Sequence, residues 1–340
     1  LFLILIKQKK TITMKNLNQT FKVMSVLFVA LFSTSCDDDN DTITPVTPQE
    51  QTIASIASNN SEFTSLVAAL NRAGLTSTLN SSGNFTVFAP TNTAFDAFLE
   101  DNNFVNLEAV PIPLLREVLL NHVIADELFA NELTTTYVKT LATGSASSNK
   151  LSMFVNTASG VRLNGVSTVT LADINASNGV IHKVNAVIGL PTIVTHATAN
   201  SNFSSLVAAL TRSDQTDQNF VGILSGTASS PFTVFAPTNA AFGSLLTEFS
   251  WADLNAVPET VLENTLKYHV VAGSNILASG IPTTATNITT FQGQTFSVNA
   301  TGGAKITDQN SRVSNIIATD VQCDNGVIHV LDKVIVPNLN

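Results

Sequence analysis

Charged side chains are scarce in this chain. Only 12% of its 340 residues are Asp, Glu, Lys or Arg, about half the share of an ordinary globular protein. The formal net charge is -9, with 16 basic residues against 25 acidic ones. This balance argues against binding nucleic acid or an anionic membrane surface, because both require clustered positive charge. The polar surface must come mainly from Thr, Ser and Asn, as expected of an extracytoplasmic β-rich protein.

Cysteine, tryptophan and tyrosine are also rare. The two cysteines, Cys36 and Cys323, are too few for a disulfide framework, and we expect Cys323 to be a free thiol at a strand end. One Trp and two Tyr against twenty Phe do not favour an aromatic platform for a sugar ligand. The five histidines lack ligand-like spacing, so we predict no metal site. No nucleophile elbow, P-loop or dinucleotide fingerprint is present, so neither a cofactor nor a hydrolase activity is expected.

Long apolar runs are confined to the N-terminal region. The first methionine is Met14, and we expect translation to begin there rather than at residue 1. A basic stretch then precedes the apolar run VMSVLFVALF at 23–32, which ends in small residues just before Cys36. The run is shorter than the roughly 20 residues of a transmembrane helix and has the length of a signal-peptide core.

This order of basic, apolar and small residues before a cysteine resembles the lipobox of bacterial lipoproteins. The pattern departs from the usual one at Phe32 and Ser33, where leucine is common. The resemblance implies that residues 1–36 are a signal-peptide region and that Cys36 becomes lipidated with a palmitate-type chain. An ordinary signal peptide with an incidental cysteine is the alternative.

The segment after Cys36 is acidic and then rich in Thr and Pro. It begins DDDND, and residues 37–50 are too short and polar to bury a core, so we expect a solvated tether. Acidic residues after a lipidated cysteine resemble the surface-export signal of lipoproteins from the Bacteroidetes group. The resemblance implies a cell-envelope protein, anchored by its lipid to the outer membrane and exposed at the surface.

The remainder of the chain contains two copies of one unit. The octapeptide FTVFAPTN occurs at 85–92 and again at 232–239, and the pentapeptide NGVIH occurs at 178–182 and at 325–329. Both pairs have the same offset of 147 residues. A repeat of this length is too long for a solenoid and indicates two globular domains in tandem.

An earlier pair of segments has a different offset. FTSLVAALNRA and FSSLVAALTRS are separated by 140 residues, so the second copy holds seven extra residues before its FTVFAPTN strand. We expect these residues to form a loop within 214–230. The predicted domains are 51–190 and 191–338, and the short join between them predicts that they touch.

Each unit begins with helical patterns. Apolar residues three and four apart predict a helix over 61–73, with Ser61 as its N-cap and Gly74 at its C-terminal stop. A second helix is predicted at about 113–122, where prolines suit the first turn.

Strand patterns follow. The β-branched and aromatic segment 85–89 predicts a strand, and Thr91 or Asn92 can cap the helix after it. From about residue 137 onward, short alternating runs separated by Gly, Asn and Ser predict further strands. Helices first and strands after them indicate an α+β domain with a mainly antiparallel sheet.

The boxes FTVFAPTN-x-AF and NGVIH-x-V-x-x-VI closely resemble the two signature boxes of the fasciclin-like adhesion domain. Between them, where that family has a Tyr-His pair, this chain has Asn121-His122 and Tyr268-His269. The resemblance covers both halves of the chain. It implies two tandem domains, each a β-sandwich or wedge with flanking helices. It also implies extracellular adhesion or matrix binding without a cofactor or turnover.

The resemblance also implies candidate partner-binding residues, because in some animal members an Asp-Ile pair and the Tyr-His segment take part in integrin binding. The matching positions are Asp173, Ile174, Tyr268, His269, Asp320 and Val321. A structural role is the alternative, since an Asp in a turn before a strand commonly caps backbone amides.

We expect structural roles for the histidines as well, since a part-buried His usually hydrogen-bonds to the backbone. His122 and His269 are predicted at helix C-termini, where the macrodipole favours a positive charge, and His182 and His329 lie within strand patterns. His196 is expected in the turn between the domains.

The sequence thus predicts a non-catalytic, surface-anchored lipoprotein that mediates cell–cell or cell–matrix contact with an extracellular protein or glycan. The alternative is a periplasmic or surface lipoprotein that binds a glycan or other ligand for nutrient uptake, which the scarcity of Trp and Tyr disfavours. If the domains bind a partner, we expect the C-terminal one to dominate, through Tyr268, His269 and the 214–230 loop.

Overall fold

The computed structural model describes residues 51–215 and 219–339. The signal-peptide region, Cys36 and the tether lie outside the described residues. From Gln49 onward the chain makes one compact unit, and both sequence repeats lie within it. In the part of the chain that the structure describes, no helix is long and apolar enough to cross a bilayer.

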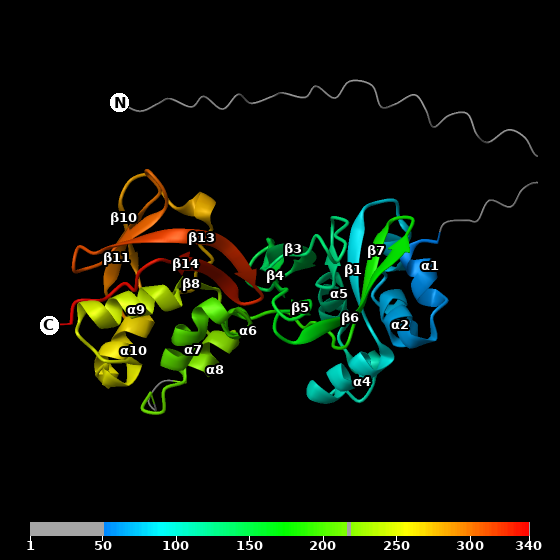
Figure 1. Ribbon diagram of the computed structural model, residues 1–340, viewed down its shortest axis with the longest axis horizontal. Coiled ribbons are helices and arrows are strands. Elements are labelled where there is room, and N and C mark those ends of the chain that lie inside the picture. The colour runs from blue at the N-terminus through cyan, green and yellow to red at the C-terminus, as the bar shows by residue number, and fades with distance from the viewer. Residues whose placement is uncertain (1–50, 216–218, 340) are drawn as a thin grey trace, which may run out of the picture. The chain divides into compact units, whose positions relative to one another are not determined.

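The N-terminal domain carries its helices before most of its strands, as the sequence predicts (Figure 1). Its helices are α1 (Ile53–Ser58), η1 (Ser61–Phe63), α2 (Thr64–Arg72), α3 (Thr76–Asn80), α4 (Asn92–Asp101), η2 (Leu107–Ala109) and α5 (Ile112–Leu120). Its strands are β1 (Phe85–Pro90), β2 (Val123–Ile124), β3 (Thr136–Thr143), β4 (Lys150–Asn156), β5 (Arg162–Leu163), β6 (Ser167–Ala176) and β7 (Gly179–Val184).

The C-terminal domain repeats this order. Its helices are α6 (Ile193–Ala199), η3 (Ser201–Phe203), α7 (Ser204–Leu210), α8 (Phe220–Ser225), α9 (Asn239–Glu248), η4 (Leu254–Ala256), α10 (Glu259–Tyr268) and η5 (Ala278–Gly280). Its strands are β8 (Phe232–Pro237), β9 (Val270–Ala272), β10 (Thr286–Thr289), β11 (Thr295–Asn299), β12 (Lys305–Thr307), β13 (Val313–Cys323) and β14 (Gly326–Leu331).

Each domain has one seven-stranded sheet. The order is β2-β1-β7-β6-β5-β4-β3 in the first and β10-β11-β12-β13-β14-β8-β9 in the second. The two signature boxes form the single parallel pair of each sheet, β1 with β7 and β8 with β14, while the other strand pairs are antiparallel. The strands β1 and β7 are adjacent in Figure 1, in cyan and green.

The letters of the first box have separate local roles. Thr91 caps α4 by accepting a hydrogen bond from the Ala94 amide (3.3 Å), as predicted. The Asn92 side chain accepts from the Ser65 amide (2.9 Å) and donates to the Ser61 carbonyl (2.8 Å), so it fixes the start of α2 against α4. The second copy uses Thr238 and Asn239 in the same way.

The predicted helix at 61–73 is present but begins differently. Asn60, not Ser61, caps η1 by accepting from the Glu62 amide (2.9 Å), and α2 follows directly. The helix stops where predicted, because Gly74 adopts a left-handed φ of 67°.

The central strand of each domain separates two cores. In β1, Val87 and Ala89 pack against the helices, while Phe88 on the other face packs with Met153 and Leu163 of β4 and β5. This two-sided burial gives the sandwich-like wedge that the family resemblance implies. In the second domain, Val234 and Phe235 divide in the same way between the two cores.

The two domains contact each other, as the short join predicts. The Lys139 ammonium of the first donates to the Asp320 carbonyl of the second (2.7 Å). The Gln322 amide donates to the Ser152 hydroxyl (3.0 Å). These contacts place β3 and β4 against β13.

Candidate partner-binding residues

Asp173 and Asp320 lie at equivalent bulges within β6 and β13. Each lies where the pairing of β6 with β7, or of β13 with β14, shifts register, and each has a left-handed backbone, with φ of 61° and 59°. The Asp173 carboxylate accepts from the Ala130 amide (2.8 Å), and that of Asp320 accepts from the Ala278 amide (2.8 Å). Both carboxylates therefore cap a backbone amide, which is the structural role that the sequence left open.

The two aspartates differ in exposure. The Asp173 side chain is exposed. Asp320 is only partly exposed, and its carbonyl accepts the Lys139 hydrogen bond from the neighbouring domain. Of the two bulges, the N-terminal one therefore offers the more accessible carboxylate.

His182 and His329 lie in the strands that pair with the two bulged strands. His182 Nδ1 accepts from the Asp173 amide (3.2 Å), and its Nε2 donates to the Leu128 carbonyl (2.9 Å). His329 Nε2 likewise donates to the Ile276 carbonyl (2.7 Å). Burial lowers the pKa of both imidazoles below its usual value, because it disfavours the charged form. Both rings are therefore neutral. His182 links its bulge to a loop, whereas His329 bonds only to the Ile276 carbonyl, since its Nδ1 has no hydrogen-bond partner.

His122 and His269 connect a helix end to the segment after the last strand of each domain. His122 Nδ1 donates to the Val118 carbonyl (2.7 Å), and Nε2 accepts from the Ile188 amide (2.8 Å). His269 makes the same bonds to the Thr265 carbonyl (2.7 Å) and the Ile335 amide (3.1 Å).

The charge expected on these helix-end histidines is absent. Burial lowers the pKa of both His122 and His269 to about 4, so the rings are neutral at pH 7. A proton on Nε2 would also face an amide N–H that now donates to it. The position at a helix C-terminus and the hydrogen bonds to the backbone were both predicted correctly, whereas the expected part of the macrodipole falls away with the charge.

The residues before these histidines are buried too. Tyr268 is 0% exposed and donates its hydroxyl to the Thr295 carbonyl (2.7 Å). Asn121, also 0% exposed, donates to the Ile188 and Gly189 carbonyls (3.3 and 3.0 Å). The difference between Tyr and Asn therefore does not reach the surface, and it gives no reason for the C-terminal domain to dominate binding.

Ile174 and Val321, the residues that follow the two aspartates, pack into the domains. Val321 is buried in the helical core of the C-terminal domain, and Ile174 is partly buried against that of the N-terminal domain. Among the six predicted contact residues, Tyr268, His269 and Val321 have buried side chains. These three side chains could affect partner binding only by stabilising the fold, whereas the exposed Asp173 carboxylate can contact a partner directly.

The expected position of His196 is wrong. It lies within α6, not in a turn, and is fully buried. Its ring contacts Tyr137 edge-on at 5.2 Å between centroids and lies near the backbone of Ser152 and Gln322, but neither nitrogen makes a hydrogen bond. Burial lowers its pKa to about 4. A histidine in the short segment IVTHATA carried too little periodicity to reveal this helix.

Part of the segment that was expected to be the inserted loop is helical. Within 214–230, which was expected to be a loop, α8 forms and buries Phe220 and Leu224. The helices α6, α7 and α8 line an apolar cavity of about 120 Å³ in the C-terminal domain. The sequence analysis missed this cavity, although the four-residue spacing of Phe220 and Leu224 was a signal for the helix beside it.

Other chemistry-bearing residues are isolated. Cys323 is a free, buried thiol at the last position of β13, as predicted, and burial raises its pKa. Over the described residues, no group of three or more His, Cys, Asp or Glu side chains is placed to hold a metal ion.

Comparison with known protein families gives two matches, one for each domain. The sequence matches the fasciclin domain family over residues 61–191 and 201–337. It is 36% identical over 180 residues to protein sll1483 of Synechocystis sp., covering 51% of this chain and 89% of that protein. It is 28% identical over 271 residues to human periostin, covering 75% of this chain but 29% of periostin. The solved FAS1 domain pair of the insect cell adhesion molecule fasciclin I aligns with a TM-score of 0.45 and 21% identity, over 80% of this chain and 92% of that one.

Proposed function

Since the chain belongs to the fasciclin domain family, we propose that it is a non-catalytic adhesion protein that presents two fasciclin domains at the cell surface. Fasciclin domains are associated with cell adhesion in related proteins. The proposed partner is an extracellular protein or glycan, and the contact is between cells or between a cell and its matrix.

One observation carries this proposal: the histidines that both repeats share form hydrogen bonds to the backbone. His122, His182, His269 and His329 each bond to backbone groups of another segment, and burial keeps them neutral. A general base must reach a proton on a substrate. Because these imidazoles are engaged inside the domains, none of them is placed to reach a substrate, which supports a binding role over a catalytic one.

Asp173 is our candidate for a direct contact on that surface. Its carboxylate is exposed on a bulge whose backbone is fixed by His182 and by the Ala130 amide. A charged group on a rigid bulge loses little conformational freedom when a partner binds. Asp320 has the same local geometry, but Lys139 contacts its bulge, so we assign the larger contribution to Asp173.

We further propose that Cys36 carries the lipid that keeps these domains at the outer membrane. The acidic residues and the Thr/Pro-rich tether after it would separate the lipid from the first described helix. The basic, apolar and small residues before Cys36 support this proposal.

Adhesion of coated beads tests the proposed function. Beads carrying the chain from Asp37 to Asn340 should bind cells or matrix of the source organism, and soluble protein should compete. Beads with the heat-unfolded chain are the control. Equal binding by native and unfolded protein, or no binding by either, would contradict the proposal.

A further inference from the structure

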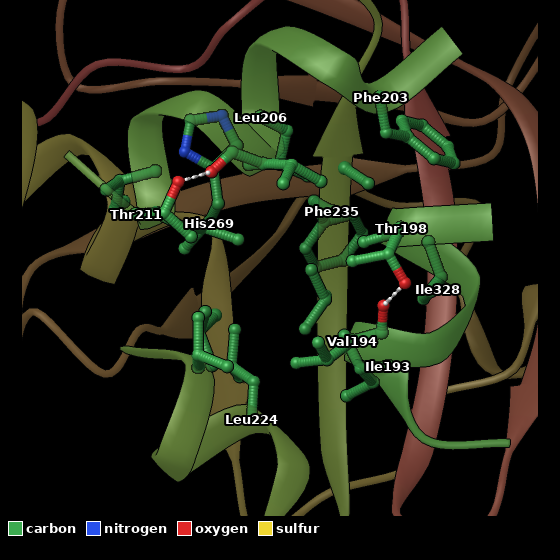
Figure 2. Close-up of a pocket in the computed structure, with 18 residues that line it drawn as sticks. Ile193, Val194, Thr198, Phe203, Leu206, Thr211, Leu224, Phe235, His269 and Ile328 are labelled. Atoms are coloured by element: carbon green, nitrogen blue, oxygen red, sulfur yellow. Dashed lines mark hydrogen bonds between the residues drawn. The ribbon is translucent and has the colours of Figure 1, made fainter. Parts of the chain in front are cut away.

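The C-terminal domain contains an apolar cavity that is not involved in the proposed adhesion. Its floor is formed by buried side chains of the helices and of β8 and β14, among them Phe203, Leu206 and Ile328. Towards the surface it is bordered by Thr198 and Thr211, which are exposed, and by the partly exposed Leu210. Figure 2 shows the labelled side chains among them, Phe203, Leu206, Ile328, Thr198 and Thr211, arranged around the cavity. A molecule can therefore reach the buried floor past this border.

The polar groups of the cavity wall already have hydrogen-bond partners within the protein. The Thr198 hydroxyl donates to the Val194 carbonyl (2.9 Å), and the Thr211 hydroxyl donates to the Val207 carbonyl (2.8 Å), as the dashed lines in Figure 2 show. Both nitrogens of His269 are bonded to backbone groups. No side chain named here has a donor left for a water molecule or a polar ligand. The two threonine oxygens can still accept a hydrogen bond, but these residues lie at the exposed border and not on the apolar floor.

The volume of the cavity, about 120 Å³, then decides what fits. A water molecule in a cavity needs roughly two to four polar partners, and an apolar cavity of about 150 Å³ stays dry and binds benzene or xenon. The cavity in this chain has a similar size and an apolar wall, so it favours an apolar occupant over water.

The N-terminal domain provides an internal comparison. Leu70, the counterpart of Leu210, is buried, and the nearby Leu75 amide donates to its carbonyl (2.9 Å), so α2 and α3 are tightly connected. In the C-terminal domain the connection from α7 to α8 is longer by the insertion, and Leu210 is left partly exposed. The accessible cavity is thus associated with the insertion and not with the shared fold.

We propose that this cavity is a binding site for one small, neutral, apolar molecule of the size of a benzene ring. The site lies inside one domain and does not depend on the proposed adhesion.

Benzene titration followed by methyl NMR tests this proposal, with the protein from Asp37 to Asn340. Benzene should shift the methyl signals of Val207, Leu210 and Leu224 in a saturable manner. The counterparts Val67, Leu70 and Leu79 in the N-terminal domain should not move. Phenol should bind about tenfold more weakly, because burying its hydroxyl without a partner costs on the order of 1–3 kcal/mol.

Two substitutions test the location. Ala197→Leu fills the cavity and should weaken benzene binding by about tenfold or more, since a displaced contact of 1.4 kcal/mol is tenfold in affinity. Ala208→Leu makes the same change at an exposed position of α7 and should bind benzene like the wild type. If Ala197→Leu does not fold, Val207→Phe at the partly exposed border should have the same blocking effect. Absence of saturable shifts, equal shifts in both domains, or unaltered binding by the folded blocking variants would overturn the proposal.

Discussion

At the scale of single residues, Asp173 combines a structural bond with an exposed charge. The two roles can be separated because asparagine tolerates a left-handed backbone and its amide oxygen can still accept from the Ala130 amide. Alanine disfavours a left-handed backbone and has no side-chain acceptor. The structure therefore supplies a substitution that removes the charge alone and another that removes both.

We expect Asp173→Asn to reduce adhesion while changing the free energy of unfolding by less than about 1 kcal/mol. Asp173→Ala should destabilise the domain by roughly 1–3 kcal/mol, because it leaves the Ala130 amide without its acceptor and strains the backbone. Urea denaturation and bead adhesion measure the two effects. Asp320→Asn is the matched control and should affect adhesion less. Unchanged adhesion of a folded Asp173→Asn protein would show that its carboxylate is only structural.

Cys36 is the second residue with a separable role. Cells fed an alkyne analogue of palmitate should label the wild-type chain and fail to label Cys36→Ser, because the thiol is the proposed attachment point of the lipid. Cys323→Ser, which alters the buried thiol, is the matched control and should label like the wild type. Equal labelling of the wild type and Cys36→Ser would exclude lipidation at this position.

At the scale of elements, buried neutral histidines connect helices to strands and make stability depend on pH. The pKa of His122, His196 and His269 is about 4 in the folded protein, against about 6.5 in an unfolded chain. As the pH falls, these histidines therefore take up protons in the unfolded state at a higher pH than in the folded state. Stability should be complete above pH 6.5 and decline between pH 6.5 and 4, by roughly 3 kcal/mol for each histidine.

The substitution His196→Phe isolates one of these contributions. His196 makes no hydrogen bond, so a phenyl ring should keep its contact with Tyr137 and lose nothing polar. Urea unfolding at several pH values should show a smaller loss of stability below pH 6.5 than in the wild type. His122→Phe, which removes two hydrogen bonds, should instead lower stability at pH 7 as well. A wild-type pH profile for His196→Phe would refute the assignment.

Elements with strong local signals could be predicted from the sequence. The strand at Phe85–Pro90 and the helix capped by Thr91 follow from β-branched residues, a proline and an N-cap. The helix α1 was missed because it is short and stabilised by distant groups, such as the Asn178 side chain that accepts from the Ile53 amide (2.9 Å). α8 was missed because the whole segment that holds the insertion was interpreted as a loop.

The candidate site was predictable only in part, for a related reason. Sequence patterns made Asp173 a candidate contact residue and left capping of a backbone amide as the alternative, and the hydrogen bond from the Ala130 amide confirms that capping. Asp173 lies within β6, however, and not in a turn before a strand. They could not show that Tyr268 points inward, because its burial depends on a bond to Thr295 in a strand far along the chain. The cavity likewise depends on how three separate helices meet.

At the scale of the whole molecule, the two domains contact each other and would present their proposed binding sites together. The hydrogen bonds from Lys139 to Asp320 and from Gln322 to Ser152 join their sheets. Two weak sites held together raise the effective concentration of the second one once the first is bound. This arrangement suits adhesion, in which many weak contacts resist detachment.

The detachment force between single cells tests the central claim, adhesion at the cell surface, most directly. Cells that lack the protein should separate at lower force than wild-type cells, and expression of the full chain should restore the force. Soluble protein from Asp37 to Asn340 added to wild-type cells should lower it by competition. Equal forces with and without the protein, and no effect of the soluble competitor, would contradict the account.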